Sequence, residues 1–287
     1  MNSIFTRTLK ALCSVMVAAM LSACGASSTV DPFQPTRVVG LGDGYNDITA
    51  TVREGSTTDT VVQQMAAYFG QSNVVSYAGN GKKIADLASQ ITTATNAHAF
   101  SAGDMVVITV GTHDVIDGTN LTTAKSDLVA AVQSLLDAGV KHVLIMPVLE
   151  VSLTPWGLTG NPSFSTTATN TFNDAILTVL STTFGGQSAN KVIYANASGL
   201  TVAFRNATSI ALAYSPFTDT GFGGTNPACG SGSVANTAWL GCDAPSNANS
   251  TNVNYTTMLF ADGIHLTPAG NRWAAGFLYN ATAQGWR

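Results

Sequence analysis

Residues 105–110, Met-Val-Val-Ile-Thr-Val, form an almost unbroken apolar run. A strand that faces water on one side alternates apolar and polar residues. A near-continuous apolar run is instead typical of a strand buried on both faces, and such strands occur in parallel sheets covered by helices. The run therefore predicts a buried strand of a parallel α/β sheet.

The same pattern recurs along the chain, where short β-branched runs alternate with segments that carry apolar residues at helical spacing. We predict strands over residues 37–41, 73–78, 105–110, 143–148 and 191–195, and helices over residues 57–69, 82–97, 122–138, 166–184 and 268–283. Residues 150–163, rich in Gly and Pro, are expected to form a loop. Strands that alternate with helices of this length predict an α/β fold, a three-layer α/β/α sandwich with a flavodoxin-like parallel sheet of about five strands.

The N-terminal residues have the features of an export signal. Arg7 and Lys10 precede an apolar run at residues 11–23 that is too short to remain as a membrane span. The run ends in Leu-Ser-Ala-Cys-Gly at residues 21–25, which resembles a bacterial lipobox, although a plain secretory signal is the alternative. We expect a lipoprotein signal peptide at 1–23, lipidation of Cys24, a lipid-anchored tether at 24–36 and one domain at 37–287. Gly25 after the cysteine favours sorting to the outer membrane of the bacterial cell envelope.

The remaining cysteines agree with export. Cys13 leaves with the signal and Cys24 would carry the lipid, so Cys229 and Cys242 remain, separated by a Gly/Ser/Asn-rich stretch. Two cysteines in an oxidising compartment are expected to form a disulfide. No histidine lies near them in the sequence, and we expect neither a bound metal nor a cofactor.

Charge limits the partners of the chain. It has twelve Lys and Arg, two of them in the signal, against sixteen Asp and Glu. A nucleic-acid-binding domain needs a basic surface, so nucleic acid is excluded as a partner. We expect a monomer whose only membrane contact is the anchor at Cys24.

The strongest chemical signal is the Asp-x-x-His spacing of Asp262 and His265, just before the last predicted helix. This spacing lets the carboxylate reach the imidazole Nδ1 and leaves Nε2 free as a general base. A helix-capping Asp beside a surface His is the structural alternative.

Three further turns follow predicted strands. They contain Gly44, Gly81 and His113, and the carboxyl ends of parallel strands lie at one edge of a sheet. Asp43 and Asp47, which flank Gly44, are expected to brace the first turn through hydrogen bonds.

These blocks, Gly42-Asp-Gly44, Gly81, Gly111-Thr-His-Asp114 and Asp262-Gly-Ile-His265, resemble in their order the four motifs of the SGNH, or GDSL, ester hydrolases (lipases and esterases). The resemblance implies that Asp262 and His265 are catalytic and that Gly44 occupies the position of the serine nucleophile. It also implies that backbone N–H groups of Gly44 and Gly81 bind the oxyanion, with His113 in place of the family's asparagine. Gly81 is equally explained as a turn glycine and His113 as a cap of the strand end.

Glycine at position 44 has no nucleophilic atom, so the usual covalent mechanism is closed. Three interpretations remain: hydrolysis of acyl or acetyl esters of lipid or glycan by water that His265 activates; a pseudo-hydrolase that binds an ester, acetyl or carboxylate group; and a structural lipoprotein. Tyr45 is a conceivable nucleophile, but its high pKa and bulk argue against it. The retained Asp262–His265 pair argues against a purely structural role.

Overall fold

The computed structural model describes residues 33–49, 60–160, 164–185, 192–195, 259–283 and 286. The chain separates into two compact units, Met1–Phe33 with Arg287, and Gln34–Trp286. The predicted signal peptide, the lipidation site Cys24 and the cysteines Cys229 and Cys242 lie outside the described residues. In the part that is described, no helix has the length and apolar character needed to cross a membrane.

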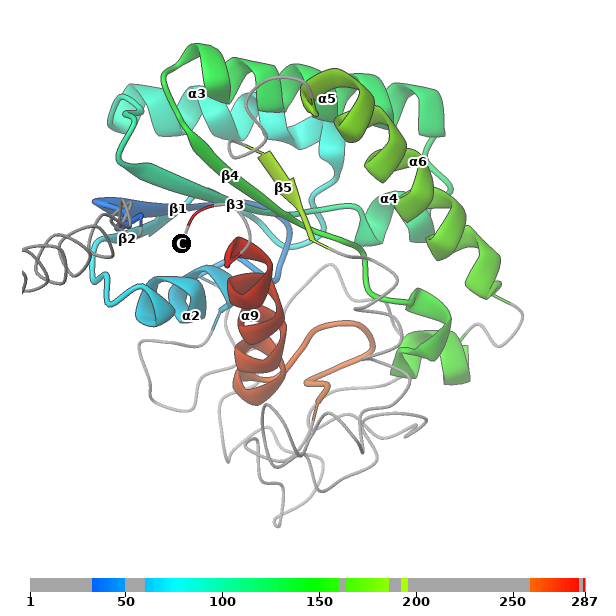
Figure 1. The fold of residues 1–287 in the computed structure, drawn as a ribbon. Helices are drawn as coiled ribbons and strands as arrows, with labels where there is room; N and C mark the ends of the chain where they lie inside the picture. The colour runs from blue at the N-terminus through cyan, green and yellow to red at the C-terminus, as the bar shows by residue number, and fades with distance from the viewer. Residues whose placement is uncertain are drawn as a thin grey trace, which may run out of the picture. The chain divides into compact units, whose positions relative to one another are not determined.

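The unit Gln34–Trp286 is built on one sheet of five parallel strands in the order β2-β1-β3-β4-β5 (Figure 1). The strands are β1 (Arg37–Gly42), β2 (Val74–Ser76), β3 (Asp104–Thr109), β4 (His142–Met146) and β5 (Val192–Tyr194). The apolar run at 105–110 forms most of β3, which lies at the centre of the sheet and is buried along its whole length. The predicted α/β fold with its parallel sheet is therefore confirmed.

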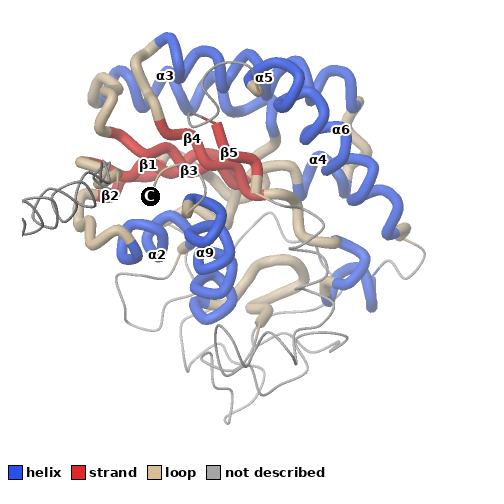
Figure 2. The backbone as a smooth tube through the Cα atoms, in the orientation of Figure 1, coloured by secondary structure: helices blue, strands red, loops and turns tan. Residues whose placement is uncertain are grey.

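Helices cover both faces of this sheet (Figures 1 and 2). One face carries α3 (Leu87–Ala97), α5 (Leu121–Asp137) and α6 (Thr166–Phe184), and the other carries α2 (Val61–Tyr68) and α9 (Pro268–Thr282). Val39 and Leu41 of β1 belong to the core shared with the first group. Gly40 lies between them on the opposite face, where a Cβ atom would come within 3.0 Å of Val62 Cγ1. Glycine at this position therefore allows α2 to lie close to β1.

The structure corrects the starts of two predicted helices. The helix predicted over 57–69 begins only at Val61, because Thr60 and Gln63 form a capping box there. The segment predicted as a helix from residue 82 starts with a 3₁₀ turn, η1 (Ile84–Asp86), before α3.

Residues 150–163, predicted as a loop, contain a 3₁₀ turn, η2 (Val151–Leu153), and a π-helical turn, η3 (Trp156–Gly160). A short helix, α4 (Thr112–Ile116), follows β3 and was not predicted. Each of these elements, η2, η3 and α4, has at most five residues, fewer than the window over which helical periodicity can be recognised.

Candidate active site

Asp262 and His265 form a buried pair in the loop before α9. Asp262 Oδ2 lies 2.8 Å from His265 Nδ1, and Oδ1 accepts hydrogen bonds from the backbone N–H groups of Ile264 and His265 at 2.9 and 2.8 Å. Burial by itself would raise the pKa of Asp262, but the charge of His265 and these hydrogen bonds lower it below its ordinary value. An ionised Asp262 fixes a proton on Nδ1 and so orients the ring, with Nε2 on the side away from the carboxylate.

Backbone hydrogen bonds hold this loop in place. The N–H of Ala261 donates to the carbonyl of His265 at 2.8 Å, and the N–H of Trp156, in η3, donates to the carbonyl of Gly263 at 2.8 Å. Thr267 caps α9 by accepting the N–H of Gly270 at 3.0 Å. The loop that carries the imidazole is therefore held by its own backbone, by the capped start of α9 and by η3.

The turn after β1 brings Gly44 under the imidazole. Gly42 has a φ of 106°, which turns the chain sharply, and the N–H of Asp43 donates to the carbonyl of Thr109 at the end of β3 at 2.6 Å. A Cβ atom on Gly44 would lie 2.7 Å from His265 Nε2. The space that a side chain at residue 44 would occupy therefore adjoins the imidazole of His265.

Two acidic side chains make hydrogen bonds around this turn. Asp43 Oδ1 accepts the N–H of Tyr45 at 3.3 Å. Asp47 accepts the N–H of Thr49 at 2.9 Å through Oδ1 and the N–H of Asn80 at 3.1 Å through Oδ2. Asp47 thus links the turn after β1 to the turn after β2.

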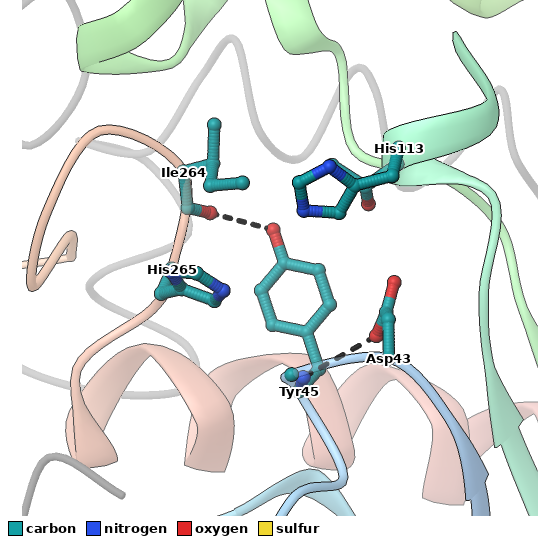
Figure 3. A pocket seen from close by; sticks show the side chains of 7 residues that line it. Asp43, Tyr45, His113, Ile264 and His265 are labelled. Atoms are coloured by element: carbon teal, nitrogen blue, oxygen red, sulfur yellow. Dashed lines mark hydrogen bonds between the residues drawn. The ribbon is translucent and has the colours of Figure 1, made fainter. Parts of the chain in front are cut away.

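A small cavity lies beside Gly44 (Figure 3). It offers about 10 Å³ to the centre of a water molecule, which is room for about one water. The residues that line it come from three segments of the chain: Asp43, Gly44, Tyr45, Thr112, His113, Ile264 and His265.

Tyr45 is held inside this site. Its hydroxyl donates to the carbonyl of Ile264 at 2.7 Å, and its ring lies edge-on to that of His265 with the ring centroids 6.2 Å apart. Burial, together with the charges of Asp43 and Asp262, raises the pKa of the Tyr45 hydroxyl well above its ordinary value. The hydroxyl therefore stays protonated and hydrogen-bonded, which argues against Tyr45 as a nucleophile.

His113 reaches the same cavity from α4. Gly111, with a φ of 116°, follows β3 and is the N-cap residue of this helix. His113 is 4 % exposed, and its buried Nε2 has no hydrogen-bond partner among the described residues. Burial, followed by the charge of His265, lowers the pKa of His113. The ring is therefore neutral at pH 7 and can present an N–H group to a ligand in the cavity.

The structure thus brings Gly44, His113 and His265 to one cavity, with Asp262 behind His265. Gly81 is not among the lining residues and has a φ of 74° in the turn after β2. Its neighbour Asn80, which the sequence analysis did not identify, places Oδ1 2.9 Å from His265 Nε2. The only sequence signal for Asn80 is its position in a Gly-Asn-Gly turn after a predicted strand.

Comparison with known proteins supports this architecture. The family model described as GDSL-like Lipase/Acylhydrolase matches residues 38–277. A search of curated proteins found no match.

The search of solved structures found matches at low sequence identity. The chain is similar to the acetyl xylan esterase AlAXEase, with 18 % identity, a TM-score of 0.50 and coverage of 85 % of this chain and 98 % of that one. It is also similar to Axe2, an acetylxylan esterase from Geobacillus stearothermophilus, with 13 % identity, a TM-score of 0.49 and coverage of 89 % and 98 %. A member of the lipolytic G-D-S-L family from Veillonella parvula matches with 13 % identity, a TM-score of 0.48 and coverage of 86 % and 98 %. The family model covers most of the chain, so the protein belongs to the GDSL-like lipases and acylhydrolases, a family of ester hydrolases.

Proposed function

We propose that this protein hydrolyses acyl or acetyl esters of lipids or glycans with a water molecule that His265 activates, in place of a serine side chain. The observation that carries the proposal is the position of His265. Its Nε2 borders the space that a side chain at Gly44 would fill, while Asp262 holds its Nδ1. An imidazole oriented in this way is suited to take a proton from water.

In this mechanism a water molecule beside Gly44 takes the place of the Asn80 carboxamide at His265 Nε2, attacks the ester carbonyl carbon and gives a proton to Nε2. A new C–O bond forms, and the carbonyl π electrons move to the oxygen. The backbone N–H of Gly44 and the neutral imidazole of His113, which both border the cavity, stabilise that oxyanion, as donors aimed at developing charge do in other acyl-transfer enzymes. When the intermediate collapses, the ester C–O bond breaks and the leaving alkoxide takes the proton from His265.

The expected turnover is weak. Removing the nucleophile of a serine protease lowers kcat by roughly 10⁶, and the rest of the site still contributes roughly 10³ over uncatalysed hydrolysis. An activated ester such as p-nitrophenyl acetate is therefore a suitable first substrate. Acetylated xylan is a reasonable second one, because AlAXEase, which shares the fold, is an acetyl xylan esterase.

The test compares p-nitrophenyl acetate hydrolysis by the wild type and by His265→Gln. A general base contributes about 10²–10⁴-fold, so His265→Gln should lower kcat/KM at least ~100-fold. His98→Gln is the matched control, because His98 is exposed at the end of α3 and should leave the rate unchanged. A fluorophosphonate probe should not label the wild type. Equal hydrolysis by the wild type and His265→Gln would refute the proposal.

The direct contact between Asn80 and His265 favours a second function, binding without turnover. Because Asn80 occupies Nε2, a ligand can enter the cavity without meeting a free base. A binding protein would show no His265-dependent hydrolysis, yet acetate would bind in calorimetry and His113→Leu would abolish that binding.

We also propose that the protein is a monomeric lipoprotein of the bacterial cell envelope, anchored in the outer membrane through Cys24 and stabilised by a Cys229–Cys242 disulfide. The lipobox-like residues 21–25 and the apolar run before them support the anchor.

A further inference from the structure

Gly44 lies where the backbone does not require glycine. Its φ is not in the left-handed region, unlike those of Gly42 and Gly81. The restriction is one of space: a Cβ atom at position 44 would lie 2.7 Å from His265 Nε2, 2.9 Å from His265 Cδ2 and 3.1 Å from Asn80 Oδ1. Two side chains from distant parts of the chain therefore fill the position of a side chain at residue 44.

Those two side chains are also bonded to each other. Asn80 Oδ1 lies 2.9 Å from His265 Nε2, and Asp262 Oδ2 lies 2.8 Å from His265 Nδ1, so both ring nitrogens have partners. A carboxamide carries a donor and an acceptor and can pair with Nε2 whether or not that nitrogen is protonated.

Asn80 is held firmly enough to act in this way. Its backbone N–H donates to Asp47 Oδ2 at 3.1 Å, and Asp47 Oδ1 also accepts the Thr49 hydroxyl at 2.7 Å. The N–H of Gly79 donates to the carbonyl of Gly42 at 3.1 Å. The turn that carries Asn80 is thus tied to the turn that carries Gly44.

We propose that Asn80 is a positioning residue of this site: its carboxamide takes the hydrogen bond at His265 Nε2 that a nucleophile's hydroxyl would take, and it holds the ring over Gly44. Residues 44 and 80 therefore act as a coupled pair, because the Asn80 side chain lies in the space that a side chain at residue 44 would need. The inference rests on the proposed role of His265 as a base, but not on turnover by the wild type. Gly44→Ser alone does not create an efficient nucleophile, because the Asn80 carboxamide still occupies His265 Nε2.

The test measures the rate at which a fluorophosphonate labels residue 44, located by mass spectrometry in the full-length chain. In this reaction the serine Oγ–P bond forms, the P–F bond breaks, fluoride leaves and His265 Nε2 takes the serine proton. Neither the wild type nor Asn80→Ala has a serine at residue 44, so neither should be labelled there. Gly44→Ser should be labelled slowly, and Gly44→Ser/Asn80→Ala at least ~10-fold faster, because His265 is then free to bond to the serine hydroxyl.

Two controls separate positioning from general damage. Gly44→Ser/Asn80→Asp keeps a side chain of the same size with an acceptor at Nε2, so it should be labelled no faster than Gly44→Ser. Gly44→Ser/Asn73→Ala removes an exposed asparagine near the start of β2 and should be labelled at the rate of Gly44→Ser. Loss of structure lowers the labelling rate, so a gain on removing Asn80 cannot come from misfolding.

The inference is overturned if Gly44→Ser/Asn80→Ala, shown to be folded by circular dichroism, is labelled no faster than Gly44→Ser. If the wild type fails to hydrolyse p-nitrophenyl acetate, the proposed function fails while the labelling comparison stands, because labelling is measured at an introduced serine.

Discussion

Asp43 is a buried carboxyl group of the site, and its titration should have a large effect on the stability of the fold. Burial raises its pKa from 3.8 to about 7, against the opposing effects of hydrogen bonds and the charge of His265. Its Oδ2 is buried without a hydrogen-bond partner among the described residues. A carboxylate in such a place is stabilised less than it is in water, so the folded protein retains the proton to higher pH than the unfolded chain.

The raised pKa of Asp43 makes the free energy of unfolding depend on pH. Between the unfolded and folded pKa values of Asp43 the folded state binds more protons, so the free energy of unfolding falls as pH rises through this window. Each pH unit contributes about 1.4 kcal/mol, which gives a penalty on the order of 4 kcal/mol above pH 7. We predict that Asp43→Asn, which keeps an acceptor for the Tyr45 N–H, stabilises the protein at pH 8 relative to wild type by a few kcal/mol, and much less at pH 4.5.

Urea unfolding at the two pH values measures this difference. Asp137→Asn, at an exposed carboxyl on α5, is the matched control and should change stability equally at both. A stabilisation by Asp43→Asn that does not depend on pH would contradict the role assigned to its proton.

At the scale of single elements, α4 is the piece that places His113. It begins at Gly111, whose φ of 116° lies in a region that other residues rarely adopt. A Cβ atom there would also lie 2.7 Å from Val148 and 2.8 Å from Phe172, both of which belong to the core. Asp114 then ties α4 to η1 by accepting the N–H of Ile84 at 3.0 Å.

We predict that Gly111→Ala destabilises the protein by roughly 2–6 kcal/mol, combining backbone strain of about 1–3 kcal/mol with overpacking of about 1–3 kcal/mol. It should also lower ester hydrolysis, because α4 must shift and carry His113 with it. Gly118→Ala is the control: φ there is also positive, at 63°, but nothing lies within 4 Å of the added Cβ. Thermal and urea unfolding of Gly111→Ala and Gly118→Ala separate backbone strain from steric clash. Equal losses of stability in the two variants would show that the contact of residue 111 with the core is unimportant.

At the scale of the whole molecule, the candidate site lies entirely within the unit Gln34–Trp286. The parallel sheet collects the ends of β1, β2 and β3 at one edge, and the loop before α9 reaches the same edge. The proposed membrane anchor therefore has no part in the chemistry of the site.

We predict that a chain beginning at Gln34 elutes as a monomer, unfolds at the temperature of the full-length protein and keeps its His265-dependent hydrolysis. The full-length protein should partition into membranes of the expressing bacterium, and Cys24→Ser should move it to the soluble fraction. Intact-mass spectrometry would show the lipid on Cys24. Membrane association that survives Cys24→Ser would rule out the proposed anchor.

The sequence could predict the features that depend on short spacings. Apolar periodicity fixed the fold class and most elements; the helix over 166–184 matches α6, whereas α2 begins later because Thr60 caps it. The Asp262–His265 contact could also be predicted, since three residues of separation in a tight loop let the two side chains meet.

Only the tertiary structure decided which side chain lies at His265 Nε2, the ring nitrogen that does not face Asp262. Asn80 is 185 residues from His265 in sequence, and none of the four motif blocks contains it. The same holds for the proximity of His265 to Gly44, for the burial of His113 Nε2 away from any hydrogen-bond partner in the described part of the chain, and for the raised pKa of Asp43. Spacing along the chain determines local geometry, but burial and contacts between distant turns depend on how the whole sheet brings its strand ends together.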